Sequence, residues 1–446
     1  MKEGSLMVFL GLLAFVVDRY LVKRRSGVGA EANQRSKYRT PRSMATTKKP
    51  EVLSAARALA RLRKSLESCA SIVVFGPTRS GKTSSLLLPI LSRFDGSAVV
   101  TSVKKDLQTQ SLEARRRCSK VFVISDCPVD EGCFWDPFTQ ATDVDRAREI
   151  AHHMTISSGE YRSASADSRF WYRLAEILVS GVLLATSSMT SEKERRAICS
   201  LEDLDALLSA VETTGSYDLA QEILSILRTD ERHASSVLIT VQSVLAPHLQ
   251  ALSALGSRVQ KLDLVELMVN RERQKFTLYL SASISNQSRL APYFGTLISY
   301  MSSLIMTEEK TTSRVLFALD ELANVAPVSD LAKLASAGLS FGVRLVSVFQ
   351  DYAQVKMLYG DLAGTVVNNH AVKIFFGGLT DPFTLDLFER FRKDLEDQGS
   401  ASLIGLRRGA AYICEMNKGI DKVNFKARTY GDFQKIFTFA KKVTNN

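Results

Sequence analysis

The sequence predicts an α/β protein whose parallel sheet is interrupted by a long all-α insertion, and three observations support this class. Between residues 71 and 124, short apolar runs rich in β-branched residues alternate with helical patterns, as in the β-α-β units of a parallel sheet. Residues 143–267 show long helical periodicity with hardly any strand pattern, and strand patterns return after residue 268. The expected strands are residues 71–75, 98–103, 121–124, 276–280, 315–319, 344–349 and 372–376.

The first expected element is a short membrane-associated helix within residues 1–25. Residues 6–17 are all apolar or Gly, and the apolar run resumes at residues 20–22 after Asp18 and Arg19. This stretch is shorter than the roughly 20 residues of a typical membrane span. The basic residues that follow favour a cytoplasmic location for the rest of the chain. An amphipathic helix that docks on the protein body is the alternative interpretation.

The second expected element is a flexible basic linker, residues 26–50, in which Glu31 is the only acid. Residues 1–64 contain 15 Lys and Arg against 4 Asp and Glu, which equals the net charge of +11 for the whole chain. The remaining residues hold 43 of each sign, so the overall charge does not by itself indicate a DNA-binding body. Six scattered cysteines without a C-x-x-C pair argue against a zinc site and against a disulfide framework.

A folded domain is expected from residue 51, where a helical pattern precedes a nucleotide motif. Residues 76–83 read Gly-Pro-Thr-Arg-Ser-Gly-Lys-Thr, a complete G-x-x-x-x-G-K-[ST] phosphate loop between a strand and a helix. Gly76 and Gly81 permit the tight turn that aims backbone N–H groups at phosphate, and Lys82 reaches the β- and γ-phosphates. The Thr83 hydroxyl is expected to bind Mg²⁺, so ATP and Mg²⁺ are the expected cofactors. The expected nucleotide-binding residues are Gly76, Pro77, Thr78, Arg79, Ser80, Gly81, Lys82, Thr83 and Ser84.

Two acidic residues follow the apolar strand at residues 315–319. Because ligands bind at the carboxyl ends of parallel strands, Asp320 is expected to hold Mg²⁺ and Glu321 to accept a proton from the attacking water. The alternative is that both acids only start a helix. Combined with the phosphate loop, this pair would complete a hydrolytic site.

A glutamine, Gln350, ends the strand at residues 344–349. Beside a nucleotide, its amide could bond the γ-phosphate or the lytic water and report hydrolysis to the segment that follows. The alternative is a surface glutamine that caps a helix.

Cations that act on a neighbouring subunit's nucleotide are harder to identify from one sequence. Arg271, Arg273, Arg289 and Lys373 are candidates of equal standing. Basic clusters at residues 115–117 and 407–408 are expected either to line a DNA channel or to lie on a solvated face.

These elements divide the chain into five expected segments. They are the apolar segment 1–25, the linker 26–50, the first part of a nucleotide-binding domain 51–142, an all-α insertion domain 143–267 and the second part of the nucleotide-binding domain 268–446.

With these motifs in order, the chain resembles the type IV secretion coupling proteins of bacterial conjugation, the TraG/TraD-like ATPases, over about residues 70–430. The resemblance rests on GPTRSGKT, SVKKDLQTQS, FWDPF, LFALDELANV, VSVFQDYAQVKMLYG and VVNNHAVKIFFGGLTDPFTLDLF. The chain differs from the family in two respects. There is one short N-terminal apolar segment where many members have two spans, and Ser102 stands where an Asp is common, so no metal is assigned there.

The resemblance implies a RecA-like nucleotide domain with an inserted all-α domain. It also implies a homohexameric ring at the cytoplasmic face of the bacterial inner membrane. Such a ring would move DNA, expected to be single-stranded and attached to a relaxase, toward a type IV secretion apparatus.

Two other functions remain open from the sequence. One is a ring translocase of the FtsK/HerA kind that acts on duplex DNA. The other is a nucleotide-gated protein adaptor with slow ATPase activity, which the balanced charge of the body favours.

Overall fold

The computed structural model of the chain describes residues 52–69, 71–103, 105–127, 129, 132–255, 260–307, 313–395, 401–415 and 418–425. The expected membrane-associated segment, residues 1–25, and the basic linker, residues 26–50, lie outside the described residues.

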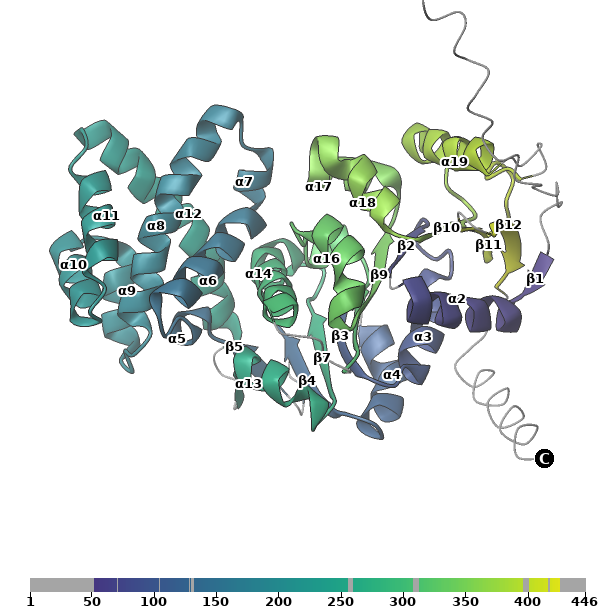
Figure 1. Ribbon diagram of the computed structural model, residues 1–446, viewed down its shortest axis with the longest axis horizontal. Helices are drawn as coiled ribbons and strands as arrows, with labels where there is room; N and C mark the ends of the chain where they lie inside the picture. Colours follow the sequence, from purple (N-terminus) through teal and green to yellow (C-terminus); the bar gives the residue numbers. More distant parts are fainter. Residues whose placement is uncertain are drawn as a thin grey trace, which may run out of the picture. The chain divides into compact units, whose positions relative to one another are not determined.

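The centre of the fold is a ten-stranded, mostly parallel sheet in the order β1-β12-β11-β10-β2-β9-β8-β3-β7-β4 (Figure 1). The predicted α/β class is therefore confirmed. Only the pairs β10–β11 and β11–β12 are antiparallel. The strands are β1 (Val52–Ser54), β2 (Ser71–Phe75), β3 (Ser97–Ser102), β4 (Lys120–Ser125), β7 (Phe276–Ser281), β8 (Val315–Leu319), β9 (Val343–Phe349), β10 (Val372–Phe376), β11 (Ala410–Glu415) and β12 (Gly419–Asn424).

Both faces of this sheet are buried, which is why its central strands are continuous apolar runs. Along β2, Ile72 and Val74 pack on one face with apolar side chains of α2, α3 and α4, while Val73 and Phe75 face the opposite core. The helices of the α/β part are α2 (Ala55–Cys69), η2 (Lys82–Leu87), α3 (Leu88–Arg93), α4 (Lys105–Arg116), α13 (Leu264–Val269), η3 (Asn270–Glu272), α14 (Gln287–Thr307), α15 (Leu322–Val325), α16 (Leu331–Ala337), η4 (Gly338–Phe341), α17 (Tyr352–Tyr359), η5 (Gly360–Leu362), α18 (Ala363–Asn369) and α19 (Pro382–Asp394).

The end of the sheet that includes β1 departs from the sequence expectation. Residues 52–54 form β1, and α2 starts only at Ala55, because β1 pairs in parallel with β12 at the far end of the chain. The β11–β12 hairpin was not expected either. Its strands pair with each other through a turn next to Gly419, which has a φ of +82°.

The helices between β5 and β6 form a bundle that Figure 1 shows apart from the strands of the large sheet. They are α5 (Pro137–Gln140), α6 (Val144–Ser157), α7 (Gly159–Ser163), α8 (Ala166–Thr186), α9 (Glu192–Ser200), α10 (Leu204–Thr213), α11 (Tyr217–Leu227) and α12 (Glu231–Leu255). By length and composition alone, α12 could cross a membrane, yet it packs against α8 and α14.

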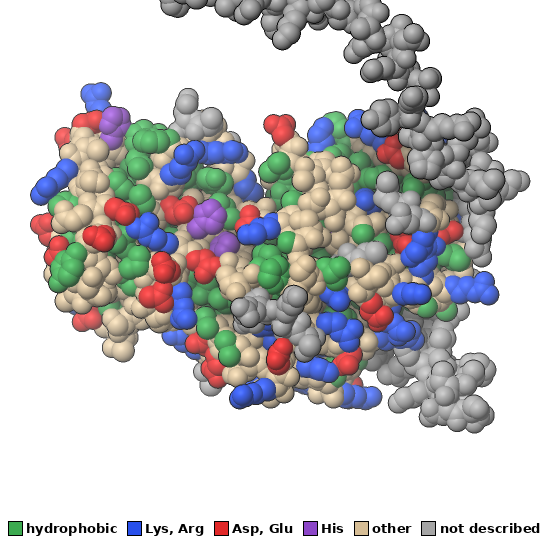
Figure 2. Space-filling model, viewed as in Figure 1, with side chains coloured by type: hydrophobic (Ala, Val, Ile, Leu, Met, Phe, Trp, Pro, Cys, Tyr) green, Lys and Arg blue, Asp and Glu red, His purple; other side chains and the backbone are tan. Residues whose placement is uncertain are grey.

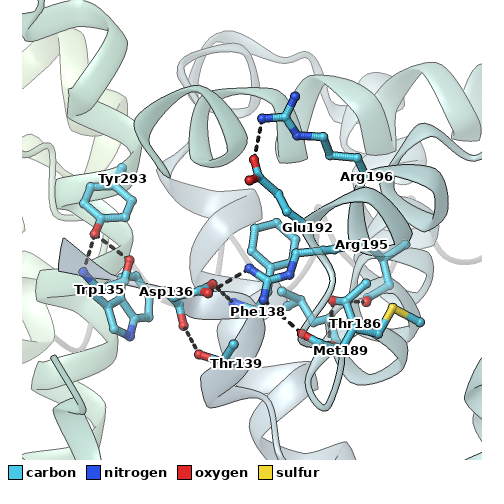
Figure 3. A network of polar contacts seen from close by, with 12 residues as sticks. Trp135, Asp136, Phe138, Thr139, Thr186, Met189, Glu192, Arg195, Arg196 and Tyr293 are labelled. Carbon is cyan, nitrogen blue, oxygen red and sulfur yellow. Dashed lines mark hydrogen bonds and ion pairs between the residues drawn. The ribbon is translucent and has the colours of Figure 1, made fainter. Parts of the chain in front are cut away.

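The chain enters and leaves this bundle at one neck. The entering strand β5 (Cys133–Trp135) pairs in parallel with the leaving strand β6 (Gln260–Leu262). Directly after β5, Asp136 accepts a hydrogen bond from Phe138 N and forms an ion pair of 2.8 Å with Arg195 on α9 (Figure 3). Both side chains of the pair are largely buried, so this contact ties the bundle to the strand that leads into it.

Side chains of both charges are mixed on the face of the molecule that Figure 2 presents. Figure 2 shows Lys and Arg side chains interspersed with Asp and Glu on the face it presents, in line with the balanced charge of the body. Among the clusters proposed from the sequence, Arg115 is fully buried and donates to Thr277 Oγ1 at 2.9 Å and to Phe94 O at 2.6 Å. It is a structural residue, so neither a DNA contact nor a solvated position describes it.

Candidate nucleotide-binding site

Three neighbouring parallel strands bring the sequence motifs to one edge of the sheet. Strand β9 lies between β2 and β8. The phosphate loop follows β2, Asp320 follows β8 and Gln350 follows β9. Since carboxyl ends of adjacent parallel strands open on the same crevice, segments far apart in the chain meet here.

The loop itself has a backbone that requires small residues. Gly76 N donates to Phe349 O at 3.2 Å and to Gln350 O at 3.1 Å, which fixes the start of the loop against β9. A Cβ on Gly76 would lie 2.8 Å from Phe376 Cβ. Gly81 has a φ of +99°, in the left-handed region that favours glycine.

Lys82 is held inside the loop. Its side chain is buried, and Nζ donates to the carbonyl oxygens of Gly76 and Pro77, the second at 3.0 Å. Burial lowers the pKa of Lys82, and the carboxylates of Glu321 and Asp320 act against that shift. The loop therefore holds a buried cation among carbonyl dipoles, next to the two acids.

Thr83 and Asp320 are in direct contact. Thr83 Oγ1 donates to Asp320 Oδ2 at 2.8 Å, and Glu321 N donates to Asp320 Oδ1 at 3.2 Å. Burial raises the pKa of Asp320 to about 6, and the hydrogen bond from Thr83 opposes that rise. A hydroxyl and a carboxylate are hard oxygen donors of the kind Mg²⁺ prefers, so the two residues fit a magnesium site.

Glu321 is held by two amides. Gln350 Nε2 donates to Glu321 Oε2 at 2.8 Å, and Asn324 Nδ2 donates to the same oxygen at 3.3 Å. Glu321 has a φ of +50°, a left-handed conformation that is uncommon for a non-glycine residue. Gln350 N in turn donates to Gln354 Oε1 at 2.9 Å, which connects Gln350 to α17.

Asn324 is a site residue that the sequence analysis did not identify. It lies three positions after Glu321, in the short helix α15. Only the turn after β8 brings its amide onto the Glu321 carboxylate. The available signal was the Asp-Glu-Leu-Ala-Asn spacing, which by itself also fits an ordinary helix start.

These groups line a cleft of about 630 Å³ between the phosphate loop and the turn after β8. Its walls also include Ser102 and, at the start of α14, Gln287. The residues that line it are Thr78, Arg79, Ser80, Gly81, Lys82, Thr83, Ser84, Leu88, Ser102, Val103, Leu107, Gln110, Ile284, Gln287, Asp320, Glu321, Asn324 and Gln350.

A second hollow, of about 710 Å³, lies on the other side of the loop. It is lined by Arg79 and by basic residues of the C-terminal strands and their connections, Arg407, Arg408 and Lys422. The basic pair at residues 407–408 thus lies beside the phosphate loop.

The candidate cations for a neighbouring subunit's nucleotide differ in exposure. Arg271 is only 1% exposed and donates to Met268 O at 2.6 Å. Lys373 is 4% exposed, with Nζ 5.1 Å from the ring centre of Phe391. Arg289 and Arg273 are exposed, and Arg289 is in the first turn of α14, next to the cleft residue Gln287.

Comparison with known proteins adds sequence relatives. Two curated proteins of Escherichia coli, each described as conjugal transfer protein TraG, match over 318 residues at 22% and 20% identity. The matches cover 64% of this chain and 48% and 49% of the relatives. The chain therefore spans about half the length of the curated relatives it matches.

The fold is also similar to solved structures. The plasmid coupling protein TrwB in complex with the GTP analogue GDPNP matches with a TM-score of 0.66 at 19% identity, covering 86% of this chain and 91% of TrwB. TrwB in complex with ADP and Mg²⁺ matches with a TM-score of 0.66 at 18% identity and the same coverage. The RecA-like phosphate-loop core predicted from the sequence resemblance is confirmed by this likeness.

A family model provides the strongest result, because it matches most of the chain. The model describes type IV secretory system conjugative DNA transfer proteins and matches residues 29–391. This chain belongs to the type IV secretory system conjugative DNA transfer family.

Proposed function

We propose that this protein is an ATP-driven DNA translocase that recruits a nucleoprotein substrate to a type IV secretion apparatus. Family membership and the TraG relatives support the transfer role. The TrwB complexes with nucleotide analogues and with ADP and Mg²⁺ support the cofactors. The observation that carries the proposal is the 2.8 Å contact between Thr83 and Asp320, which joins the phosphate loop to the acidic strand end.

The phosphate loop and the acidic and amide residues of the cleft have proposed roles. The loop N–H groups of residues 76–84 and Lys82 bind the phosphates, and Thr83 with Asp320 would hold Mg²⁺, which supplies charge neutralisation on the phosphates. Glu321 accepts a proton from the attacking water. Gln350 and Asn324 orient the Glu321 carboxylate, since both donate to its Oε2.

Gln350 is also the proposed reporter of hydrolysis. Its side chain bonds the base Glu321, while its backbone N–H bonds Gln354 at the start of α17. A change in the phosphate contacts of the Gln350 amide would therefore reach α17, whose residues are not among those that line the cleft. This is a route by which nucleotide state changes the arrangement of surface elements.

The proposed assembly is a homohexamer at the cytoplasmic face of the bacterial inner membrane, anchored through residues 1–25. In such a ring, a cation from one subunit would stabilise charge at its neighbour's γ-phosphate. Arg289 and Arg273 are the better placed candidates because they are exposed, whereas Arg271 and Lys373 are buried within their own subunit. The proposed substrate is single-stranded DNA with its attached relaxase.

ATP turnover and DNA transfer test this function. We expect Lys82→Ala to lose nucleotide binding and transfer together. We expect Glu321→Gln to keep ATP binding and lose turnover by about 100-fold or more, because the carboxylate no longer takes the proton. Glu192→Gln is the matched control, since Glu192 is an exposed acid paired only with Arg196 on the surface. Wild-type turnover and transfer in a stably folded Glu321→Gln protein would refute the proposed chemistry.

The choice of DNA distinguishes the related functions. A coupling protein of this kind should hydrolyse ATP faster with single-stranded DNA, and added salt should remove that stimulation. A stronger response to duplex DNA would instead indicate a duplex translocase. Turnover that ignores DNA altogether would indicate a protein adaptor.

A further inference from the structure

Another pocket lies at the amino ends of the strands, away from the nucleotide site. Arg314 immediately precedes β8, and Arg344 is the second residue of β9, whereas Asp320 and Gln350 follow the other ends of these strands. The pocket has a volume of about 410 Å³ and is closed by α2 and α3. It is separated from the nucleotide cleft by one strand length, roughly 20 Å.

Its lining combines apolar side chains with arginines. The apolar part is formed by Leu59 and Leu66 of α2 and by Pro89, Ile90 and Phe94 of α3 and its end. Around it lie Arg63, Arg93, Arg314 and Arg344. Glu67 and Asp95 are the two acids of the lining, and Asp95 is already paired with Lys275 at 2.5 Å.

The arginines repel one another. The charge of Arg63 contributes to a lowered pKa of Arg93, and that of Arg314 contributes to a lowered pKa of Arg344, in each case after burial as the larger cause. Within the described part of the chain, no carboxylate forms an ion pair with Arg63, Arg314 or Arg344. Among its described lining residues, the pocket therefore has four arginines against two acids, an excess of positive charge.

Arg344 is the most informative residue of the group. Its side chain is buried, with Nη1 bonded to Val343 O at 2.9 Å and Nη2 at 3.4 Å from Glu67 O. Its Nε has no partner among the described residues. A buried donor on a charged group without a partner is costly, and native folds seldom keep one without a function.

The neighbouring Arg115 shows what a structural arginine looks like in this fold. It is fully buried, and its guanidinium donates to Thr277 Oγ1, Phe94 O and Gly96 O. All three of its nitrogens are used. Arg344 differs because its Nε is buried without a partner among the described residues, while the residue itself lines the pocket.

We propose that this pocket binds a phosphate ester, with the phosphate on the guanidinium groups and the apolar or ring portion against Leu59, Ile90 and Phe94. Arginine binds phosphate through two parallel N–H donors, and several arginines at one site match a group with more than one negative charge. A ligand with a single carboxylate would leave most of the positive charge of the pocket arginines unneutralised. The same phosphate monoester is found in a nucleoside monophosphate and in the head group of phosphatidic acid.

Binding of three soluble probes tests the proposal in the full chain. They are inorganic phosphate, AMP and the short-chain lipid dihexanoylphosphatidic acid, each measured by calorimetry and by the shift in unfolding temperature. The parent protein carries Lys82→Ala, so that the phosphate loop does not contribute. We expect AMP or the lipid to bind more tightly than phosphate, because each adds a portion for the apolar floor, and the tighter of the two identifies the source.

Arg344→Gln and Arg314→Gln should each weaken this binding about tenfold or more, because each removes a charged donor. Arg228→Gln, an exposed arginine on the helical bundle, is the control and should leave binding unchanged. Without ligand, Arg344→Gln should unfold at the same or a higher temperature than its parent, because like-charge repulsion is removed. Failure of all three probes to bind, or binding that survives both substitutions together, would overturn the proposal.

Discussion

The helical bundle differs in helix capping, backbone conformation and burial of charge from the nucleotide edge, the sheet edge at which the phosphate loop, Asp320 and Gln350 lie. In the bundle, successive helices begin at a residue whose side chain accepts a backbone N–H, which satisfies a donor that the helix leaves free. These capping residues are Asp143, Ser158, Ser165, Ser191 and Asp203. Its connection to the sheet is a largely buried ion pair, Asp136 with Arg195. Local preference and tertiary packing agree at these helix starts, although Leu201, at the end of α9, has a φ of +58°.

At the nucleotide edge, the same local rules are broken. Arg79 and Glu321 have positive φ angles of 62° and 50°. Lys82 and Asp320 are both buried. Burial lowers the pKa of Lys82 and raises the pKa of Asp320, which favours the neutral form of each side chain. Neither η2 nor α15 starts with a side-chain cap.

The contrast fits the proposal that the nucleotide edge carries out a reaction at a cost in stability. Strained backbone and buried charge persist only where the surrounding structure holds them, and they concentrate at functional sites. The bundle is therefore expected to lose stability when its polar contacts are removed, whereas the nucleotide edge is expected to gain stability while losing activity.

The largest effect is expected at the neck of the bundle. Asp136→Ala leaves Arg195 largely buried without its carboxylate, and loss of one partner of a buried pair costs about 3–5 kcal/mol. Chemical denaturation measures this change, and ATP binding measured on the same protein should stay near the wild-type level. Glu192→Gln, at an exposed pair in the same bundle, should change stability by about 0.5 kcal/mol or less. Equal costs at the two positions would contradict the contrast.

At the nucleotide edge, Asp320→Asn should stabilise the protein in the absence of nucleotide and Mg²⁺. The raised pKa of about 6 means that the charged carboxylate is disfavoured by folding at pH 7. Removal of the charge should then raise the unfolding free energy at pH 7, on the order of 1–3 kcal/mol. The gain should disappear below about pH 4, where the carboxyl is protonated in both the folded and the unfolded protein. Lower stability of Asp320→Asn at pH 7 would count against this view of the site.

Acid sensitivity compares the helical bundle with the sheet, at the edge opposite the nucleotide site, through a buried histidine in each. Burial lowers the pKa of His248 on α12 and of His370 before β10 to about 4. In the unfolded protein, a histidine with a pKa near 6.5 binds a proton more readily than the buried histidine does. The free energy of unfolding is therefore highest above pH 6.5 and falls as the pH drops toward 4. Each histidine should contribute about 2 kcal/mol to the loss at pH 5.

His248→Gln and His370→Gln should each reduce the slope of stability against pH between 6.5 and 4. The glutamine amide can bond to Thr296 or Ser347, the present partners of the two imidazoles. Two slopes that match the wild type would show that neither ring remains neutral in the fold.

The smallest effect is expected from the backbone of Glu321. Asn tolerates the left-handed region better than Glu, so Glu321→Asn should raise stability by about 0.5–1 kcal/mol. Turnover should still be lost, because the shorter amide is not a base. A variant with lower stability and normal turnover would show that the conformation of this residue is not tied to its chemistry.

The sequence predicted the parts of the fold that depend on local pattern. The phosphate loop, the apolar central strands and the acidic strand end are each readable within a few residues. The pairing of β1 with β12 and the β11–β12 hairpin were missed, because they depend on contacts between distant segments. The hydrogen bond from the Asn324 amide to Glu321 depends on the turn after β8. The burial of Arg271 depends on its packing against α13.

The central claim is that Thr83 and Asp320 act together on one Mg²⁺ at the phosphate loop. Its most direct test is the affinity for ATP with and without Mg²⁺ in wild type, Thr83→Ala, Asp320→Asn and the double variant. We expect each single substitution to remove the gain in affinity due to Mg²⁺ and the double variant to lose little more, because the two residues form one site. A full gain due to Mg²⁺ in either single variant, or two independent losses that add, would contradict it.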